Sequence, residues 1–357
     1  MKQWLRERSP GEILRWGLCF LCLAVVLTVT VAENVVKGRL YDQRAAQRWS
    51  ENDDYAQISC FFSGEAGIDE LFLMELEHKI TTALGAASIT QENENARLWL
   101  HGTSLAGSAV LNSDLGTAKV KAYGVSGDFF QFHPVKLLHG AYFNDETMMQ
   151  DNILIDEETA WRLFGSNDVA GMQVTIGGVP HRVGGVFARD TGRLAKAAGL
   201  AEPVCFLSLS SLEQYATADG QYCYEVLMPN PISGFALSTV IAQAGMGGTT
   251  GENGGEEREH SSAEFVENTT RYRFLPLWDT LREFATRSMS HKGIVYPYWE
   301  NIARGWEDIL ALTLLMKLVF IIYPAVFSGV QVIRLARYLW RRWKGSKLLE
   351  SIKSKLY

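Results

Sequence analysis

The chain has 357 residues, 47% of them hydrophobic, and this length allows one or two domains. Lysine and arginine together number 34, against 40 aspartates and glutamates. Residues 33–308 hold 21 basic and 37 acidic side chains, and this acidic balance argues against nucleic acid as a partner, because phosphates attract basic surfaces.

Two apolar segments predict helices that cross a membrane. Residues 16–32 carry no charged side chain, and residues 309–333 carry only Lys317. A bilayer core is crossed by about 20 helical residues, so both segments have a suitable length. We therefore expect transmembrane helices at 16–32 and 309–333.

The charges beside these segments predict the orientation. Residues 1–15 hold four basic and two acidic side chains, and residues 334–357 hold eight basic and one acidic. Because basic flanks stay in the cytoplasm, we expect a multi-pass protein of the cell (plasma) membrane with both termini cytoplasmic and residues 33–308 outside. The alternative is a cleaved signal, with Thr30 and Ala32 before the cut. The first apolar run is longer than a usual signal core, and the alternative stays open.

The external segment begins with elements that predict an α+β fold. Residues 33–49 contain good helix formers and no proline, so we expect the first membrane helix to continue outward as a stalk. The next expected elements are a strand at 55–62, an amphipathic helix at 68–84, and strands at 97–101 and 117–125.

Residues 125–187 carry the clearest pattern. Residues 153–155 form a short apolar run typical of a buried strand, and a helix follows that ends at Gly165. Strands at 173–176 and 182–187 flank Gly177-Gly178-Val179-Pro180, which predicts a hairpin turn.

The chain then alternates strands and helices a second time. We expect a strand at 204–207, a short helix at 210–215, a strand at 222–228, a helix at 231–244 that has proline in its first turn, a strand at 271–275 and a helix at 277–285. The glycine-rich residues 245–255 cannot bury enough apolar surface to offset their ordering entropy. We predict that they form a mobile surface loop.

A second stalk is predicted to lead from Pro297 into the second apolar segment. Its apolar residues recur at helical spacing: Trp299, Ile302, Trp306 and Ile309. We expect this face to pack on the first stalk near Val36 and Leu40. Trp299, Ile302 and Trp306 are therefore candidate coupling residues.

Lys317 and Pro324 are the remaining candidates on the second membrane helix. A lysine within a span is costly and often functional, or else it extends its amine to the outer interface. Pro324 is a candidate kink. In the basic tail, Trp340 and Trp343 favour contact with anionic lipid over contact with an acidic protein.

The cysteines specify no disulfide framework. Cys19 and Cys22 lie in the first apolar segment, so only Cys60, Cys205 and Cys223 are outside. We expect Cys205 and Cys223 on neighbouring strands, where they could pair, and this pairing stays open.

No catalytic centre can be identified. The chain has no GxxxxGK[ST], no HExxH and no paired CxxC, and its histidines do not occur at metal-ligand spacing. Glu157 and Glu158 fit the first turn of a helix, where the dipole favours carboxylates. Ser126 or Asp128 fits the cap of a short helix. We expect no enzyme activity, cofactor or metal.

Residues 125–187 also carry a family resemblance. The order VSGDFF, LLHGAYF, NILIDEETAWRLFG, VAGMQVTIGG and VGGVF resembles the MacB-like periplasmic core domain of ABC-transporter permeases. The resemblance implies an α+β external domain at 33–308 that includes the stalks, and a membrane subunit that couples a separate cytoplasmic ATPase to this domain in export or mechanotransmission.

The resemblance also implies partners in the membrane. These are a second permease-like subunit or another copy of the chain. Full permeases of this kind have three further spans after the core domain and this chain has one, which favours an accessory or pairing subunit. The alternative is a membrane-anchored sensor or binding module for an extracellular peptide, without an ATPase.

Overall fold

The computed structural model describes residues 10–52, 54–91, 96–143, 151–246, 249–250, 263–284, 290–291 and 294–356. It separates into two compact units. Residues 39–309 form a folded domain, and residues 1–38 with 310–357 form a helical unit. Each unit is described by itself.

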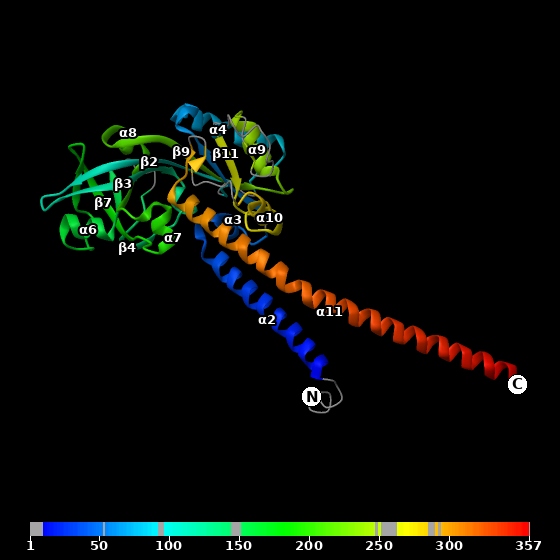
Figure 1. Cartoon of the computed structure of the whole chain (residues 1–357). Coiled ribbons are helices and arrows are strands. Elements are labelled where there is room, and N and C mark those ends of the chain that lie inside the picture. The colour runs from blue at the N-terminus through cyan, green and yellow to red at the C-terminus, as the bar shows by residue number, and fades with distance from the viewer. Residues whose placement is uncertain are drawn as a thin grey trace. The chain divides into compact units, whose positions relative to one another are not determined.

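The helical unit contains most of the two long helices, α2 (Pro10–Arg39) and α11 (Tyr298–Leu356) (Figure 1). Among the described residues, the segments Pro10–Arg39 and Tyr298–Arg341 are helices long and apolar enough to cross a membrane. The two helices contact each other: the rings of Trp16 and Phe327 lie 4.9 Å apart edge to face, and Tyr323 Oη donates to the Arg15 carbonyl at 3.2 Å.

The predicted first stalk is wrong beyond Arg39. Leu40 leaves the helical conformation, with φ −84° and ψ 72°. Two short helices follow, η1 (Tyr41–Gln43) and α3 (Ala45–Trp49). The cause is the domain: Leu40 is buried, and the Gln57 side chain accepts a hydrogen bond from Ala45 N and donates one to Asp42 O. Helix propensity in residues 33–49 is thus overridden by tertiary contacts.

The domain is built on one twisted, mixed sheet (Figure 1). Within the described residues its order is β10-β11-β1-β9-β2-β3-β8-β5-β7-β4, and β6 pairs with β2 and β7. The strands are β1 (Tyr55–Phe62), β2 (Leu100–Asn112), β3 (Thr117–Gly127), β4 (Lys136–Gly140), β5 (Asn152–Asp156), β6 (Gln173–Ile176), β7 (Val179–Ala188), β8 (Val204–Ser208), β9 (Thr217–Pro229), β10 (Thr249–Thr250) and β11 (Ala263–Glu267). The pairs β3–β8, β5–β7 and β10–β11 are parallel, and the others are antiparallel. The predicted α+β fold class is therefore confirmed.

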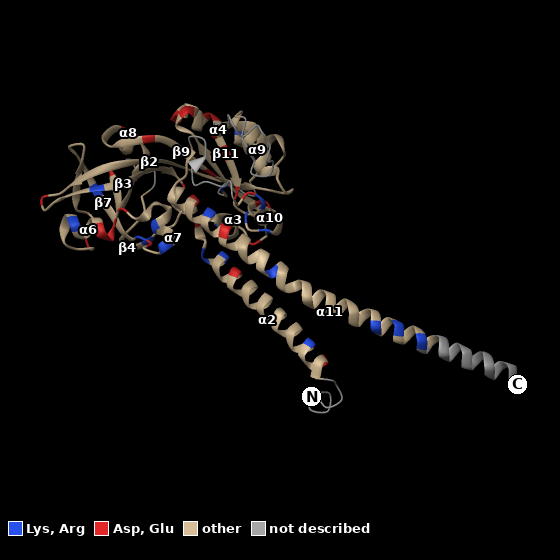
Figure 2. Cartoon of the chain, viewed as in Figure 1, with Lys and Arg blue, Asp and Glu red and all other residues tan. Residues whose placement is uncertain are grey.

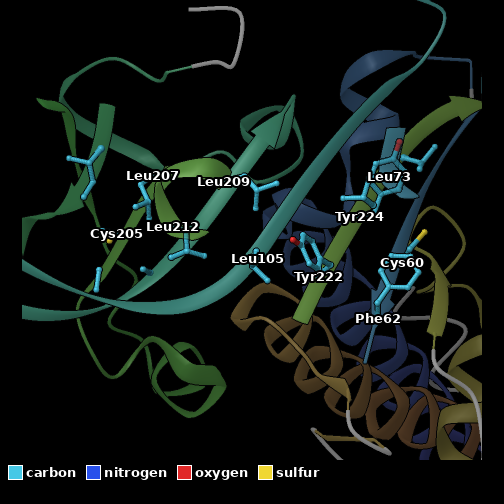
Figure 3. Packing of buried hydrophobic residues seen from close by; sticks show 14 of the residues in the cluster. Cys60, Phe62, Leu73, Leu105, Cys205, Leu207, Leu209, Leu212, Tyr222 and Tyr224 are labelled. Carbon is cyan, nitrogen blue, oxygen red and sulfur yellow. The ribbon is translucent and has the colours of Figure 1, made fainter. Parts of the chain in front are cut away.

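One face of the sheet is covered by α4 (Glu70–Ala86), α8 (Leu209–Tyr215) and α9 (Phe235–Ala244). Alternate residues of β9, Tyr222 and Tyr224, point to this face, because side chains alternate along a strand. They join the large apolar core that Figure 3 shows, together with side chains from α4 and α8.

The opposite face of the sheet carries an aromatic core. Phe206 of β8, Tyr123 of β3 and Phe129 of α5 (Phe129–Phe132) are buried here together with Trp299, from the first turn of α11. The elements α7 (Arg193–Ala195) and η3 (Lys196–Leu200) contribute further apolar side chains. The domain also contains η2 (Gly64–Ala66), α10 (Phe274–Arg282) and the short pair β12 (Ser290–His291) and β13 (Ile294–Val295).

The predicted elements of residues 125–187 are confirmed. Helix α6 (Glu157–Phe164) follows β5, and the Asp156 side chain caps it by accepting from Thr159 N. Gly165 ends the helix with φ +71°, a conformation that glycine adopts without a steric penalty. The β6–β7 hairpin turns at Gly177 and Gly178, both with positive φ, whereas Val179 and Pro180 already belong to β7.

Three other predicted boundaries are wrong. The strand expected at 97–101 begins only at Leu100, and α9 begins after Pro231 rather than including it. Residues 271–275 are a turn and the start of α10, while the strand of this region is β11. Arg271 binds buried carboxylates here instead of pairing in the sheet. Most of the predicted mobile loop lies outside the described residues, but Thr249 and Thr250 form β10.

Candidate functional site: a buried polar network beside both long helices

A chain of buried and partly buried polar side chains runs along the aromatic face of the domain. It starts three residues after α2 ends and reaches the first three turns of α11. We call it the junction network, and it consists of Asp42, Gln57, Ser59, His133, Glu225, Glu264, Asn268, Arg271, Tyr296, Glu300, Arg304 and Glu307.

His133 is the first cation of the junction network. Its Nδ1 lies 3.1 Å from Asp42 Oδ1 and its Nε2 3.3 Å from Glu225 Oε1, and the side chain is 1% exposed. Burial lowers the pKa of His133, but the hydrogen bonds to Asp42 and Glu225 outweigh it and raise the pKa from 6.5 to about 9. The ring also lies 4.4 Å from the Trp299 ring, so the imidazolium gains a cation–π contact.

The raised pKa of His133 predicts that the domain loses stability at alkaline pH. A pKa above the unfolded value of 6.5 gives stability that is fully present below pH 6.5 and is lost as the pH rises towards 9. We expect the Tm of the parent chain to fall over this window and that of His133→Asn to fall less. The half-exposed His139 provides the control: His139→Asn should keep the parent slope. Equal slopes in parent and His133→Asn would contradict the assignment.

The centre of the junction network joins β1 and β9 to the segment after β11. Ser59 and Glu225 are cross-strand neighbours, and Ser59 Oγ lies 2.8 Å from Glu225 Oε2. Asn268 Nδ2 donates to Ser59 Oγ at 2.6 Å, and Asn268 Oδ1 accepts from Arg271 Nη1 at 3.1 Å. Polar side chains therefore connect His133 to Arg271 without a break.

Arg271 is the second cation, and it is held by α11. Its guanidinium makes two hydrogen bonds to Glu300, at 2.7 and 2.6 Å, and a third to Glu307. Burial lowers the pKa of Arg271, but these two carboxylates raise it well above its ordinary value. Arg304 extends the cluster. It binds Glu300 at 2.7 Å as well as Glu264, and its guanidinium lies over the Tyr296 ring. The planar two-point pairing of Arg271 with Glu300 fixes the relative orientation of the two side chains as well as strengthening their attraction.

The junction network has the chemistry of a structural connector. Its cations are each neutralised by buried carboxylates, and breaking such a pair is strongly destabilising because a charge remains buried alone. The network attaches the segment after α2 and the first turns of α11 to the same strands, β1 and β9. Movement of either segment must therefore move or break these bonds.

The predicted coupling residues lie at different depths. Trp299 is 1% exposed and packs in the aromatic core on Tyr123, Phe129 and His133. Ile302 is partly buried against the same core, and Trp306 is partly buried. Trp299 thus belongs to the domain rather than to an exposed stalk, and its role in coupling stays a prediction.

Lys317 has a partner in the helical unit that was not predicted from the sequence. Its Nζ lies 2.6 Å from Glu33 Oε2, and Thr313 Oγ1 donates to Glu33 Oε1 at 2.7 Å. Glu33 was assigned to the stalk outside the first span, so the two charges were not considered together. The ion pair joins α2 to α11. Pro324 lies within the continuous helix α11.

Most of the junction network could not be found from sequence spacing. His133 lies 91 residues from Asp42 and 92 from Glu225, so no local motif connects them. Glu300 and Glu307 are seven residues apart and lie on the same face of α11, but nothing in the sequence marks Arg271 as their partner. The sequence offered one indication of the network: charged residues occur within segments that pack against the domain core.

Two smaller predictions are also corrected. The five cysteines are free and buried, and Cys205 and Cys223 lie on β8 and β9, which β2 and β3 separate. Asp128 precedes α5, but its side chain makes no cap. Its two carboxylate oxygens instead accept hydrogen bonds from Arg97, at 2.7 and 2.5 Å. Glu158, in the first turn of α6, binds Arg162 and Arg189.

The fold and the two apolar helices define a membrane protein with an extracytoplasmic α+β domain. Residues 23–243 match the family described as the MacB-like periplasmic core domain, and the chain belongs to this family. The match confirms the resemblance carried by residues 125–187. Asn268, Arg271 and the α11 part of the junction network lie beyond the matched residues.

Solved structures of low sequence identity are similar to the domain. The periplasmic region of MacB from Actinobacillus actinomycetemcomitans is 14% identical, with a TM-score of 0.40 over 65% of this chain and 94% of that one. The extracellular domain of the noncanonic ABC-type transporter YknZ from Gram-positive bacteria is 13% identical, with a TM-score of 0.36 over 59% and 99%. A domain of a putative permease from Porphyromonas gingivalis is 16% identical, with a TM-score of 0.32 over 54% and 83%. The comparison with curated proteins gave no match.

Proposed function

We propose that this chain is a permease-type membrane subunit that couples a separate cytoplasmic ABC ATPase to its extracytoplasmic domain. The observation that supports the proposal is the junction network, which attaches the segment after α2 and the first turns of α11 to the same two strands, β1 and β9. ATP hydrolysis is assigned to the partner and no reaction to this chain. Export and mechanotransmission without transport both agree with this role.

In this proposal both termini are cytoplasmic. Figure 2 shows basic residues on the part of α11 that follows its long uncharged stretch, and the positive-inside rule places such residues in the cytoplasm. An ATPase would then act on the membrane helices from the cytoplasmic side. In this proposal the chain works with a second permease-like subunit or another copy of itself, and the two together enclose a pathway.

The coupling is mechanical and depends on short, oriented bonds. A displacement of α11 is carried by Glu300 and Glu307 to Arg271, and from there to β1 and β9. The ion pair between Lys317 and Glu33 ties α2 to α11, so that the two helices respond together. No bound small molecule is required for this transfer.

Co-purification from native membranes tests the proposal. The tagged full chain, extracted in mild detergent, should bring down an ATPase of the ABC type together with a second membrane subunit or a second copy of itself. A tagged unrelated protein with two membrane spans is the control for non-specific recovery. A histidine kinase, or the chain alone after crosslinking in intact cells, would contradict the proposal and favour a sensor.

A further inference from the structure

A groove of about 500 Å³ lies between α4 and α8, over the sheet face opposite the junction network. This volume is within the range of small-ligand sites. Its walls come from α4 and α8, and its floor from β2, the end of β3 and β9. Leu73 of α4, Leu209 of α8 and Tyr224 of β9, which line the groove, are among the residues labelled in Figure 3.

The groove is lined by more carboxylates than basic groups. Glu70 and Glu77 come from α4, Glu213 comes from α8, and Asp128 lies at the end nearest β3. Two basic side chains also line the groove: Arg97, which binds Asp128, and His101, whose Nε2 lies 3.2 Å from Glu77 Oε1. Glu213 accepts a hydrogen bond from the Tyr222 hydroxyl. The carboxylates only accept hydrogen bonds, and they leave the groove with a negative balance. A ligand that fits must therefore donate hydrogen bonds and carry positive charge.

Tyr224 provides an independent observation that points to a ligand. Its side chain is 1% exposed, and among the described residues its hydroxyl has no hydrogen-bond partner. A buried hydroxyl without a partner is costly, and native proteins rarely keep one without a reason. Tyr224 lines the groove, so a ligand inserted there could complete its hydrogen bonding.

The remaining lining fits an aliphatic stem. Leu73, Met74 and Leu209 provide apolar surface beside the carboxylates. Lysine and arginine side chains combine an apolar stem with a cationic head, and they pack the stem while the head binds oxygen atoms. This combination matches the groove better than a small inorganic cation, which would need converging oxygen ligands. Among the described residues no cluster suited to a metal ion was found.

We propose that the groove between α4 and α8 binds a lysine or arginine side chain of an extracytoplasmic peptide. Its cationic head lies among Glu77, Glu213 and the Tyr224 hydroxyl, and its stem lies on Leu73 and Leu209. This site is separate from the junction network, but consecutive residues of β9 contribute to the two sites. Tyr224 faces the groove and Glu225, the next residue of β9, belongs to the junction network.

Binding of a triarginine amide tests the site without any ATPase. The full chain in detergent is titrated with the fluorescein-labelled peptide at low salt, and anisotropy is measured. Tricitrulline amide, which has the same shape without charge, should bind at least about tenfold more weakly, as expected for loss of a charged hydrogen bond. Equal affinity for both peptides would overturn the proposal.

Variants locate the binding. The double change Glu77→Gln and Glu213→Gln should weaken triarginine binding by about tenfold or more, and Tyr224→Phe should weaken it by a smaller factor while keeping the fold. The matched control is Glu75→Gln, because Glu75 is exposed on α4 and pairs with Lys79. Unchanged affinity in the double variant, or an equal loss in the control, would overturn the site. Tighter binding of spermidine than of triarginine would overturn the assignment to a peptide. None of these outcomes depends on the proposed coupling function.

Discussion

Replacing Arg271 by methionine should lower the free energy of unfolding of the domain by about 3–5 kcal/mol, the usual cost of removing one partner from a buried ion pair. The side chain is 3% exposed and binds Glu300 and Glu307. Methionine fills much of the same volume but leaves both carboxylates buried with one cation fewer. Arg271→Lys should cost less, because it keeps the charge and loses the planar two-point pairing.

Urea unfolding of the full chain in detergent, followed by tryptophan fluorescence, measures this effect. Arg282→Met is the matched control, because Arg282 is 70% exposed and its distance to Asp279 is 3.7 Å. The control should change the free energy of unfolding by less than about 0.5 kcal/mol. If Arg271→Met is as stable as the control, the buried cluster does not hold α11 to the domain.

Replacing Trp299 by alanine should also cost about 3–5 kcal/mol, as for other large-to-small changes in a packed core. The ring is fully buried and contacts Tyr123, Phe129 and His133. Its loss leaves a cavity and also removes the aromatic partner of the His133 imidazolium. We therefore expect the stability of Trp299→Ala to depend less on pH between 6.5 and 9 than that of the parent.

Trp161→Ala separates this effect from the general loss of a tryptophan. Trp161 is 59% exposed on α6 in the same domain, so its replacement should be close to neutral. Thermal unfolding monitored by circular dichroism suits both variants, because it does not depend on the fluorophore. A Trp299→Ala variant as stable as Trp161→Ala would show that the first turn of α11 is not part of the domain core.

Local pattern predicted the elements whose signals lie within a few residues. β1 was predicted with its observed bounds, and α6 with its end at Gly165, because the helical spacing of the apolar residues and the glycine are adjacent in sequence. The helix expected at 33–49 failed at Leu40 because burial of Leu40 and the hydrogen bonds of Gln57 are contacts across the fold. Propensity cannot represent such contacts.

The candidate site was predicted only in part. Trp299 was selected for its helical spacing, but its neighbours Tyr123 and Phe129 are more than 160 residues earlier in the chain. Lys317 is unusual within an apolar segment, but its pairing with Glu33 was not predicted, because the two residues lie on different helices. Arg271 was placed in a strand, so its three hydrogen bonds to Glu300 and Glu307 were not predicted.

Coupling through the junction network should change the distance between the domain and the membrane helices during ATP turnover. Spin labels at cysteines replacing Ser238 on α9 and Leu339 on α11, both exposed positions, report this distance in the complex purified with its ATPase. We expect ATP to shift the distance distribution in the parent, and Arg271→Lys to reduce the shift while the complex stays assembled and hydrolyses ATP. A distribution that is the same with and without ATP, or a full shift in Arg271→Lys, would contradict coupling through the junction network.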